Sequence, residues 1–322
     1  MAGRHIRDMI TAYGERDDLK FRRAAQGIIQ AEEAKRHTTL ARELRTVLAA
    51  NYGPSAGDAP PMPDVPVDRD SSMPLAYVQS TDGFLDDLIL DTAVEHGLKQ
   101  LVREVRNWNT LDSANIPRRN RLLLSGPPGC GKTSAAAALA HELGRPLVIA
   151  RVEGLMSSYL GETASNLSSL FAFASSGPYV LLLDEFDSLG KMRDDPSDHG
   201  ELRRVVNAVL QQIDGYRGPS IIVAATNHSQ VLDAALWRRF DAVVELGLPT
   251  PAQTAAVVQR LLPKPAFVLA KDQLSQLTGL PHAAAEYFAN SARRHSILDG
   301  SKTVRPTDIT RALNETASRR WL

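Results

Sequence analysis

The feature that most constrains this chain is the segment Gly126-Pro-Pro-Gly-Cys-Gly-Lys-Thr133, which matches the pattern G-x-x-x-x-G-K-[ST]. The aliphatic run 121–125 precedes it, and the alanine-rich stretch 133–143 follows it. Glycines let successive backbone N–H groups curl around a phosphate, and the N-terminus of a helix adds positive charge there. The sequence therefore predicts a strand, a phosphate-binding loop and a helix, in that order.

The side chains of this loop predict its ligands. Lys132 is expected to neutralise the β- and γ-phosphates of ATP, and the hydroxyl of Thr133 is expected to bind Mg²⁺. ATP and Mg²⁺ are therefore the predicted ligands. The residues predicted to bind them are Gly126, Pro127, Pro128, Gly129, Cys130, Gly131, Lys132, Thr133, Ser134 and Asp184, with Thr133 and Asp184 as the metal ligands.

Strands and helices alternate around the loop, which predicts an α/β fold with a doubly wound parallel sheet, as in P-loop NTPases. The predicted strands are 121–125, 146–151, 179–184, 220–226 and 242–247, and the helices between them include 133–143 and 201–213. Beyond Pro249 the pattern becomes helical, at about 251–262, 282–295 and 307–318. A small helical lid domain is therefore expected after the sheet.

Polar side chains follow two of the predicted strands. Asp184 and Glu185 come directly after the aliphatic run 181–183, and Asn227 follows the run 220–226. We expect Asp184 to hold Mg²⁺ through water, Glu185 to act as the general base on the attacking water, and Asn227 to orient that water. These carboxylates and the loop should lie at the same edge of a parallel sheet.

Two adjacent arginines, Arg238 and Arg239, follow further along the chain. They could form ion pairs with surface carboxylates of the same chain. Alternatively, they could be arginine fingers that reach the γ-phosphate held by a neighbouring subunit and stabilise the charge of the transition state. The sequence leaves both interpretations open.

The chain of 322 residues is long enough for roughly two domains. Its zero net charge is a sum of +3 over 1–50, −7 over 51–100 and +4 over the rest. Prolines and acidic residues gather where the charge is negative, which indicates a linker. We predict an N-terminal helical module at 1–52, a Pro/Asp-rich linker at 53–80, an ATPase domain at 81–248 and a helical lid at 249–322.

The predicted N-terminal module contains three apolar stretches with helical spacing, which indicates a helical hairpin or a three-helix module. The apolar positions are Ile6, Met9, Ile10 and Tyr13; Phe21, Ala25, Ile28 and Ile29; and Leu40, Leu44, Val47 and Leu48. Each face could pack internally, associate with another copy or recruit a partner.

Taken together, these motifs resemble those of AAA ATPases, a branch of the AAA+ superfamily that remodels proteins. The resemblance rests on GPPGCGKT, LLLDEFDSLG (181–190), ELRRVVNAVLQQIDG (201–215), AATN (224–227) and LWRRFD (236–241), and it extends over about 82–322. It implies a ring, usually a hexamer, in which ATP hydrolysis unfolds or disassembles a protein client. A finger supplied by a neighbour requires a head-to-tail interface, which closes into a ring.

The resemblance also implies a pore loop at Tyr159, Leu160 and Gly161, whose aromatic ring would grip a threaded chain. Two departures limit what it implies. The lid segment 279–284 lacks the family's acidic residue, which leaves His282 without an assigned role. The family's Asp-Ile/Val-Gly-Gly adenine segment is not visible, and 112–116 is the candidate substitute.

The N-terminal module and the segment 158–166 resemble stand-alone bacterial AAA ATPases that are often encoded beside subtilisin-like serine proteases, which implies a serine protease as partner. Two competing functions remain: an ATP-gated module that regulates a partner enzyme, and a DNA-associated AAA+ ATPase. Neutral charge argues against general capture of nucleic acid.

A single cysteine excludes an intrachain disulfide, and no apolar run is long enough for a membrane helix. We therefore expect a cytoplasmic protein without a membrane partner. The lone cysteine is Cys130 of the loop, so alkylation of an accessible thiol there should inhibit ATP binding.

Overall fold

The computed structural model describes residues 2–14, 18–35, 37, 39–44, 47, 62–68, 70–151, 160–186, 201–227, 237–262 and 269–321. These residues form two compact units, Met1–Pro63 and Asp64–Leu322. The predicted pore-loop residue Tyr159 lies outside the described part, and of Leu160 and Gly161 only the helical backbone is described.

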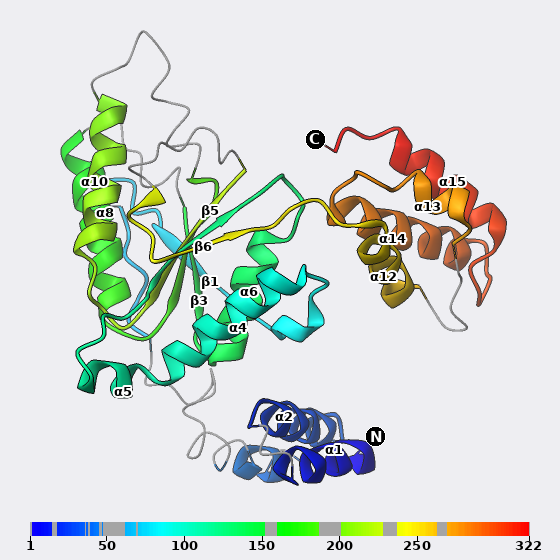
Figure 1. The fold of residues 1–322 in the computed structure, drawn as a ribbon, viewed down its shortest axis with the longest axis horizontal. Coiled ribbons are helices and arrows are strands. Elements are labelled where there is room, and N and C mark those ends of the chain that lie inside the picture. The colour runs from blue at the N-terminus through cyan, green and yellow to red at the C-terminus, as the bar shows by residue number, and fades with distance from the viewer. Residues whose placement is uncertain are drawn as a thin grey trace. The chain divides into compact units, whose positions relative to one another are not determined.

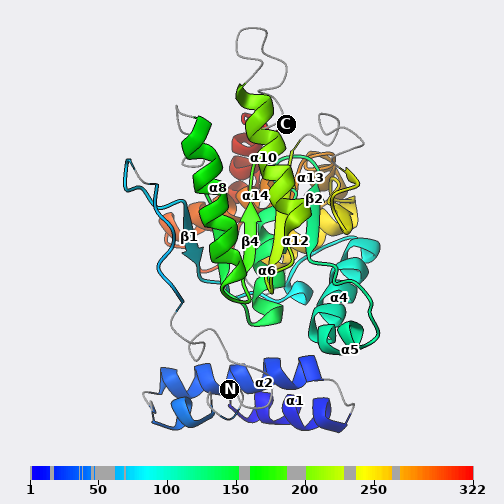
Figure 2. The same cartoon turned by 90° about the vertical axis from the view of Figure 1, so that its left-hand side faces the viewer.

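The first unit contains helix α1 (Ala2–Gly14), helix α2 (Asp18–Ala34) and a short helical segment at 39–44. Helices α1 and α2 lie side by side (Figure 2). A small core joins α2 to the third segment through Ala25, Ile29, Ala41 and Leu44. The unit is therefore helical, and its core uses positions that the helical spacing singled out.

The apolar face predicted on α1 does not pack inside the described part of the chain. Ile6, Ile10 and Tyr13 are exposed, whereas the small residue Ala12 is buried. Of the alternatives left open for this face, the exposure of these three side chains favours self-association or recruitment of a partner over internal packing.

The second unit is built on a six-stranded sheet with the order β1-β3-β4-β5-β2-β6. All neighbouring strands are parallel except β1 and β3, which are antiparallel. The strands are β1 (Ala76–Gln79), β2 (Arg121–Ser125), β3 (Leu147–Ala150), β4 (Val180–Leu183), β5 (Ile221–Thr226) and β6 (Ala242–Glu245).

The predicted α/β fold is confirmed, with two corrections. The linker was predicted to extend to residue 80, but 76–79 form strand β1 at the edge of the sheet. The sheet was predicted to be parallel, but β1 makes it mixed. The edge strand is only four residues long and exposes three of them, so its alternation is too short to distinguish from an extended linker.

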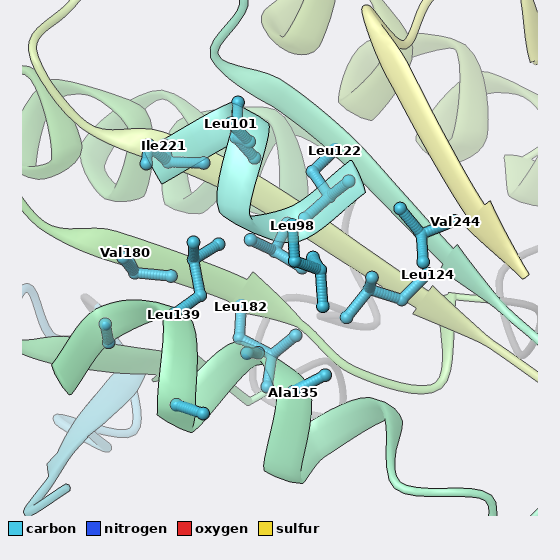
Figure 3. Close-up of a cluster of buried hydrophobic side chains, with 14 of the residues drawn as sticks. Leu98, Leu101, Leu122, Leu124, Ala135, Leu139, Val180, Leu182, Ile221 and Val244 are labelled. Atoms are coloured by element: carbon cyan, nitrogen blue, oxygen red, sulfur yellow. The ribbon is translucent and has the colours of Figure 1, made fainter. Parts of the chain in front are cut away.

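Helices cover both faces of the sheet (Figure 1). Helices α8 (Leu160–Ser175) and α10 (Glu201–Gly215) lie on one side, and α4 (Thr92–Arg106) and α6 (Lys132–Leu143) lie on the other. Two short helices, η1 (Leu85–Asp87) and α5 (Trp108–Ser113), flank α4. The core under α4 and α6 is almost wholly aliphatic, with Leu98, Leu122, Leu124, Leu139 and Leu182 fully buried (Figure 3). This core fixes the loop between β2 and α6.

The predicted helical lid is formed by α12 (Pro251–Leu261), α13 (Lys271–Ser275), α14 (His282–Leu298) and α15 (Pro306–Ala317). It has its own core, which includes Val258, Leu277, Phe288 and Ile309. Thr250 caps α12, because its hydroxyl accepts a bond from the N–H of Gln253 while the Gln253 side chain accepts one from the N–H of Thr250.

Candidate nucleotide-binding site

The predicted phosphate loop connects the end of β2 to the start of α6. Gly126 has a φ of +142°, and a Cβ built on it would lie 2.0 Å from the carbonyl oxygen of Leu246. Gly131 has a φ of +91° and directly precedes α6. Only glycine fits these positions without strain, so the backbone N–H groups of the loop can approach a ligand closely.

Lys132 is 6% exposed, and its ammonium group donates to the carbonyl oxygens of Gly126 (2.8 Å) and Pro127 (2.9 Å). These bonds fold the side chain back over the loop. The positive charge therefore lies against the concave backbone where phosphate oxygens would be held. The motif predicts that Lys132 contacts the phosphates from this loop.

Thr133 and Asp184 lie together although they are far apart in sequence. The Thr133 hydroxyl donates to Oδ2 of Asp184 at 2.8 Å. A hydroxyl and a carboxylate are both oxygen ligands, which suit Mg²⁺ when phosphate oxygens and water complete its coordination. Among the described residues, no group of three or more His, Cys, Asp or Glu side chains could hold a metal by itself. The Thr133–Asp184 pair therefore fits a metal that is shared with a nucleotide.

Glu185 follows Asp184 in an uncommon backbone conformation. Its φ is +52°, although it is not glycine, and its N–H donates to Oδ1 of Asp184 at 2.9 Å. Non-glycine residues seldom adopt this left-handed conformation, which costs about 1–2 kcal/mol. The Glu185 side chain is exposed, as a general base for solvent water requires.

Asn227 directly follows β5, the strand between β4 and β2. The carboxyl ends of parallel strands meet at one edge of the sheet, so Asn227, Glu185 and the phosphate loop share that edge. The structure thus brings together four of the predicted elements: the loop, the metal ligands, the base and the amide.

The two candidate finger residues differ. Arg239 forms an ion pair with Asp214 at the end of α10, which is the surface pairing that the sequence left open. Arg238 is exposed and, within the described part, has no carboxylate partner. The next charged residue, Asp241, is structural, because it accepts bonds from the backbone N–H groups of Asn120 (3.1 Å) and Arg121 (3.0 Å). Among the described residues, Arg239 thus has a carboxylate partner in its own chain and Arg238 has none.

A cavity of about 300 Å³ opens beside the loop. Its lining includes Leu88, Ile89, Cys130, Ser134 and His282. A second cavity of about 490 Å³ shares part of this lining and extends along the end of β6. The volume and the mostly apolar walls suit a flat heterocycle such as a nucleotide base.

Two expectations from the sequence can be compared with these cavities. Residues 112–116, the candidate adenine segment, line neither cavity, whereas residues 87–91 contribute to their walls. His282, which had no assigned role, lines both cavities, and its Nε2 lies 3.1 Å from the carbonyl oxygen of Ile89. The signal for 87–91 was weak, since the segment lacks the paired glycines by which the family's site is found.

The lid contacts the phosphate loop directly. The N–H of Ala283, in the first turn of α14, donates to the carbonyl oxygen of Gly129 at 3.0 Å. The Nδ1 atom of His282 is buried and has no hydrogen-bond partner within the described part. Burial lowers the pKa of His282, so its imidazole is neutral near pH 7 and has one unused ring nitrogen next to the cavity. A nucleotide base or ribose could satisfy it.

The environment of Cys130 corrects a further expectation. Its side chain is 1% exposed, and burial raises the pKa of its thiol. A buried thiol with a raised pKa reacts slowly, because the thiolate is the nucleophile. The accessibility that the alkylation prediction required is therefore absent.

Comparison with known proteins identifies the family. The model of the ATPase family associated with various cellular activities (AAA) matches residues 122–248. An uncharacterized AAA family ATPase, y4kL of Sinorhizobium fredii, is 37% identical over 99% of this chain and 96% of its own length. The chain therefore belongs to the AAA family of ATPases.

Two further similarities cover the ATPase region. The ATP-dependent zinc metalloprotease FtsH 3 of Sphaerobacter thermophilus is 36% identical over 62% of this chain, which corresponds to 42% of the length of that protein. The crystal structure of the FIGL-1 AAA domain aligns with a TM-score of 0.59 and 22% identity, covering 80% of this chain and 92% of that one. The second similarity supports the fold. Across the described residues, no helix combines the length and apolar character needed to cross a membrane.

Proposed function

We propose that this protein hydrolyses Mg²⁺-ATP and couples hydrolysis to the remodelling of a protein client. The observation that carries the ATPase part is the 2.8 Å contact between the Thr133 hydroxyl and the Asp184 carboxylate, beside a loop whose glycines and lysine suit a triphosphate. When bound there, Mg²⁺ would neutralise charge on the phosphate oxygens.

The proposal gives each side chain at the sheet edge a separate role. Lys132 binds the β- and γ-phosphates, and Thr133 and Asp184 hold the metal. Glu185 takes a proton from the attacking water, and Asn227 holds that water in line. Arg238 completes the site of a neighbouring subunit, since Arg239 is paired with Asp214 within its own chain.

The proposal that this protein remodels a protein client rests on its membership of the AAA family. We propose a hexameric ring in which Tyr159, Leu160 and Gly161 grip an unfolded segment of the client. A match to an ATP-dependent protease supports an action on polypeptides. The proposal includes a separate serine protease as a partner, as the resemblance to stand-alone bacterial ATPases implies.

The test compares Glu185→Gln with Thr133→Ala. Loss of the general base should lower turnover about 10²–10⁴-fold while ATP affinity is retained. Thr133→Ala should weaken Mg²⁺-dependent ATP binding, because it removes one metal ligand. Single-turnover hydrolysis and equilibrium binding of a fluorescent ATP analogue measure both effects. Normal turnover by Glu185→Gln would reject the assigned base.

The same Glu185→Gln variant separates remodelling from regulation. Because it should bind ATP without hydrolysing it, a remodelling ATPase becomes a trap that retains its client. A regulatory module would instead activate its partner fully with bound, uncleaved ATP. Recovery of clients by the trap, identified by mass spectrometry, supports remodelling, and full activation of a partner enzyme by the variant contradicts it.

A further inference from the structure

The chain enters the second unit through a tight turn that is followed by β1. The N–H of Asp68 donates to the carbonyl oxygen of Met73 at 2.8 Å, and the N–H of Ser72 donates to the carbonyl oxygen of Asp68 at 3.0 Å. Val67 and Pro74 face each other as an antiparallel bridge. We call residues 66–79, which comprise this turn and β1, the entry strap.

The Asp68 carboxylate accepts hydrogen bonds both from within the entry strap and from helix α8. Its Oδ1 accepts bonds from the N–H (2.8 Å) and hydroxyl (2.7 Å) of Ser71, within the turn. Its Oδ2 accepts a bond from Nδ2 of Asn166 at 2.7 Å, in helix α8. Asp68 is 7% exposed and Asn166 is 2% exposed, so water competes little for this contact.

The hydrogen bonds from Ser71 and Asn166 lower the pKa of Asp68 to about 2. The carboxylate therefore stays charged at every pH at which the protein would be assayed. Hydrogen bonds to an ionised acceptor are stronger than neutral ones. The contact between Asp68 and α8 is thus a firm anchor, which pH does not switch.

Asn166 lies on the inner face of α8, next to the fully buried Leu167 and Leu170. It is six residues beyond Leu160, or about 9 Å along the helix axis. The entry strap has a second attachment at the end of β3, where the N–H of Arg151 donates to the carbonyl oxygen of Leu75 at 2.8 Å. The strap therefore binds both elements that flank the sequence positions 152–159.

We propose that Asp68 is a positioning residue, which fixes α8 and the end of β3 to one strap so that work on a client is transmitted to the ATPase core. The inference rests on the proposed function, in which Tyr159 grips the client. Asp68 does not touch ATP, and its loss should spare basal hydrolysis.

The test exchanges the hydrogen-bond donor and acceptor between positions 68 and 166. Asn166→Asp removes the amide donor and places a second carboxylate against Asp68, whereas the double variant Asp68→Asn/Asn166→Asp restores a donor and an acceptor with their positions reversed. Ser168→Asp is the matched control, because it adds the same charge to an exposed position of α8. ATP turnover is measured with and without β-casein, an unfolded polypeptide that serves as the probe.

We expect β-casein to stimulate turnover by the wild type and Ser168→Asp equally. Asn166→Asp should keep its basal kcat and its KM for ATP within twofold of the wild-type values. The increase in turnover that β-casein produces should be at least fivefold smaller than in the wild type. The double variant should recover this increase to within twofold of the wild type.

Three results would overturn the inference while leaving the proposed function intact. These are full stimulation of Asn166→Asp, a parallel loss of basal and stimulated turnover, and a double variant that is no better than Asn166→Asp. If the wild type hydrolyses ATP but is not stimulated, threading itself is rejected and the inference falls with it.

Discussion

One added methyl group can test the contact between the phosphate loop and the lid. Gly129 has a φ of +71°, and a Cβ built on it would lie 2.9 Å from the Cβ of Ala283 and 3.3 Å from the Cβ of Pro281. Neither neighbour can rotate away, because each atom is attached directly to the backbone. Gly129→Ala therefore combines about 1–2 kcal/mol for the left-handed conformation with about 1–3 kcal/mol for overpacking.

Gly131→Ala is the matched control. Gly131 also has a positive φ, of +91°, but its added Cβ would meet nothing within 4 Å. It should carry only the conformational cost. A second substitution, Ala283→Gly, removes the methyl group that the new side chain of Gly129→Ala would strike. After the effect of Ala283→Gly alone is subtracted, we expect this substitution to restore about 1–2 kcal/mol of unfolding free energy to Gly129→Ala and none to Gly131→Ala.

Thermal unfolding of the six proteins, monitored by circular dichroism, gives the required comparison: wild type, three single variants and two double variants. For a unit of this size, each kcal/mol shifts Tm by about 2–4 °C. The recovery with Gly129→Ala should therefore be about 2–8 °C. If Gly129→Ala and Gly131→Ala lose the same stability and Ala283→Gly is additive with both, the lid does not contact the loop in solution.

Three further predictions follow from the charged and thiol side chains. Arg238→Ala should lower ATP turnover at least tenfold in the assembled protein. Arg239→Ala, which only breaks the pair with Asp214, should change turnover less than threefold. Equal effects of the two variants in a steady-state assay would contradict the assignment of Arg238 as the arginine finger. Asp241→Asn should cost about 1–3 kcal/mol in denaturant unfolding, because the carboxylate accepts several hydrogen bonds, and an unchanged midpoint would refute its structural role. Iodoacetamide should label Cys130 at least about tenfold more slowly in native than in denatured protein; equal rates by mass spectrometry would show that the thiol is accessible.

Local sequence was sufficient to predict those elements whose residue pattern is complete within one short segment. Residues 121–125 form β2, as predicted, because an aliphatic run followed by a glycine-rich loop can be buried in only a few ways. The phosphate loop and the acidic pair Asp184-Glu185 were predicted for the same reason. The edge strand 76–79 was missed, since it is short and mostly exposed and is held by the backbone of β3.

The parts of the site that sequence missed depend on contacts between distant segments. No sequence pattern indicated a role for His282. Its position beside the phosphate loop depends on the hydrogen bond from the lid residue Ala283 to Gly129 of the loop. The two cavities beside the phosphate loop are lined in part by the segment 87–91, which carries no glycine pair, because η1 and α4 pack against α6 on either side of it. Asp68 looked like one acid among several in a linker.

The sequence by itself determined the fold class, the phosphate loop and the order of the candidate catalytic residues, because spacing along a backbone fixes which groups follow each strand. It left Arg238 and Arg239 equivalent. Only the tertiary structure separated them, since the Asp214 carboxylate that pairs with Arg239 comes from α10, 25 positions earlier. Burial likewise decided that Cys130 is protected and that Asp68 anchors α8. Which partner a charged side chain meets depends on distances through space, and a linear pattern does not contain them.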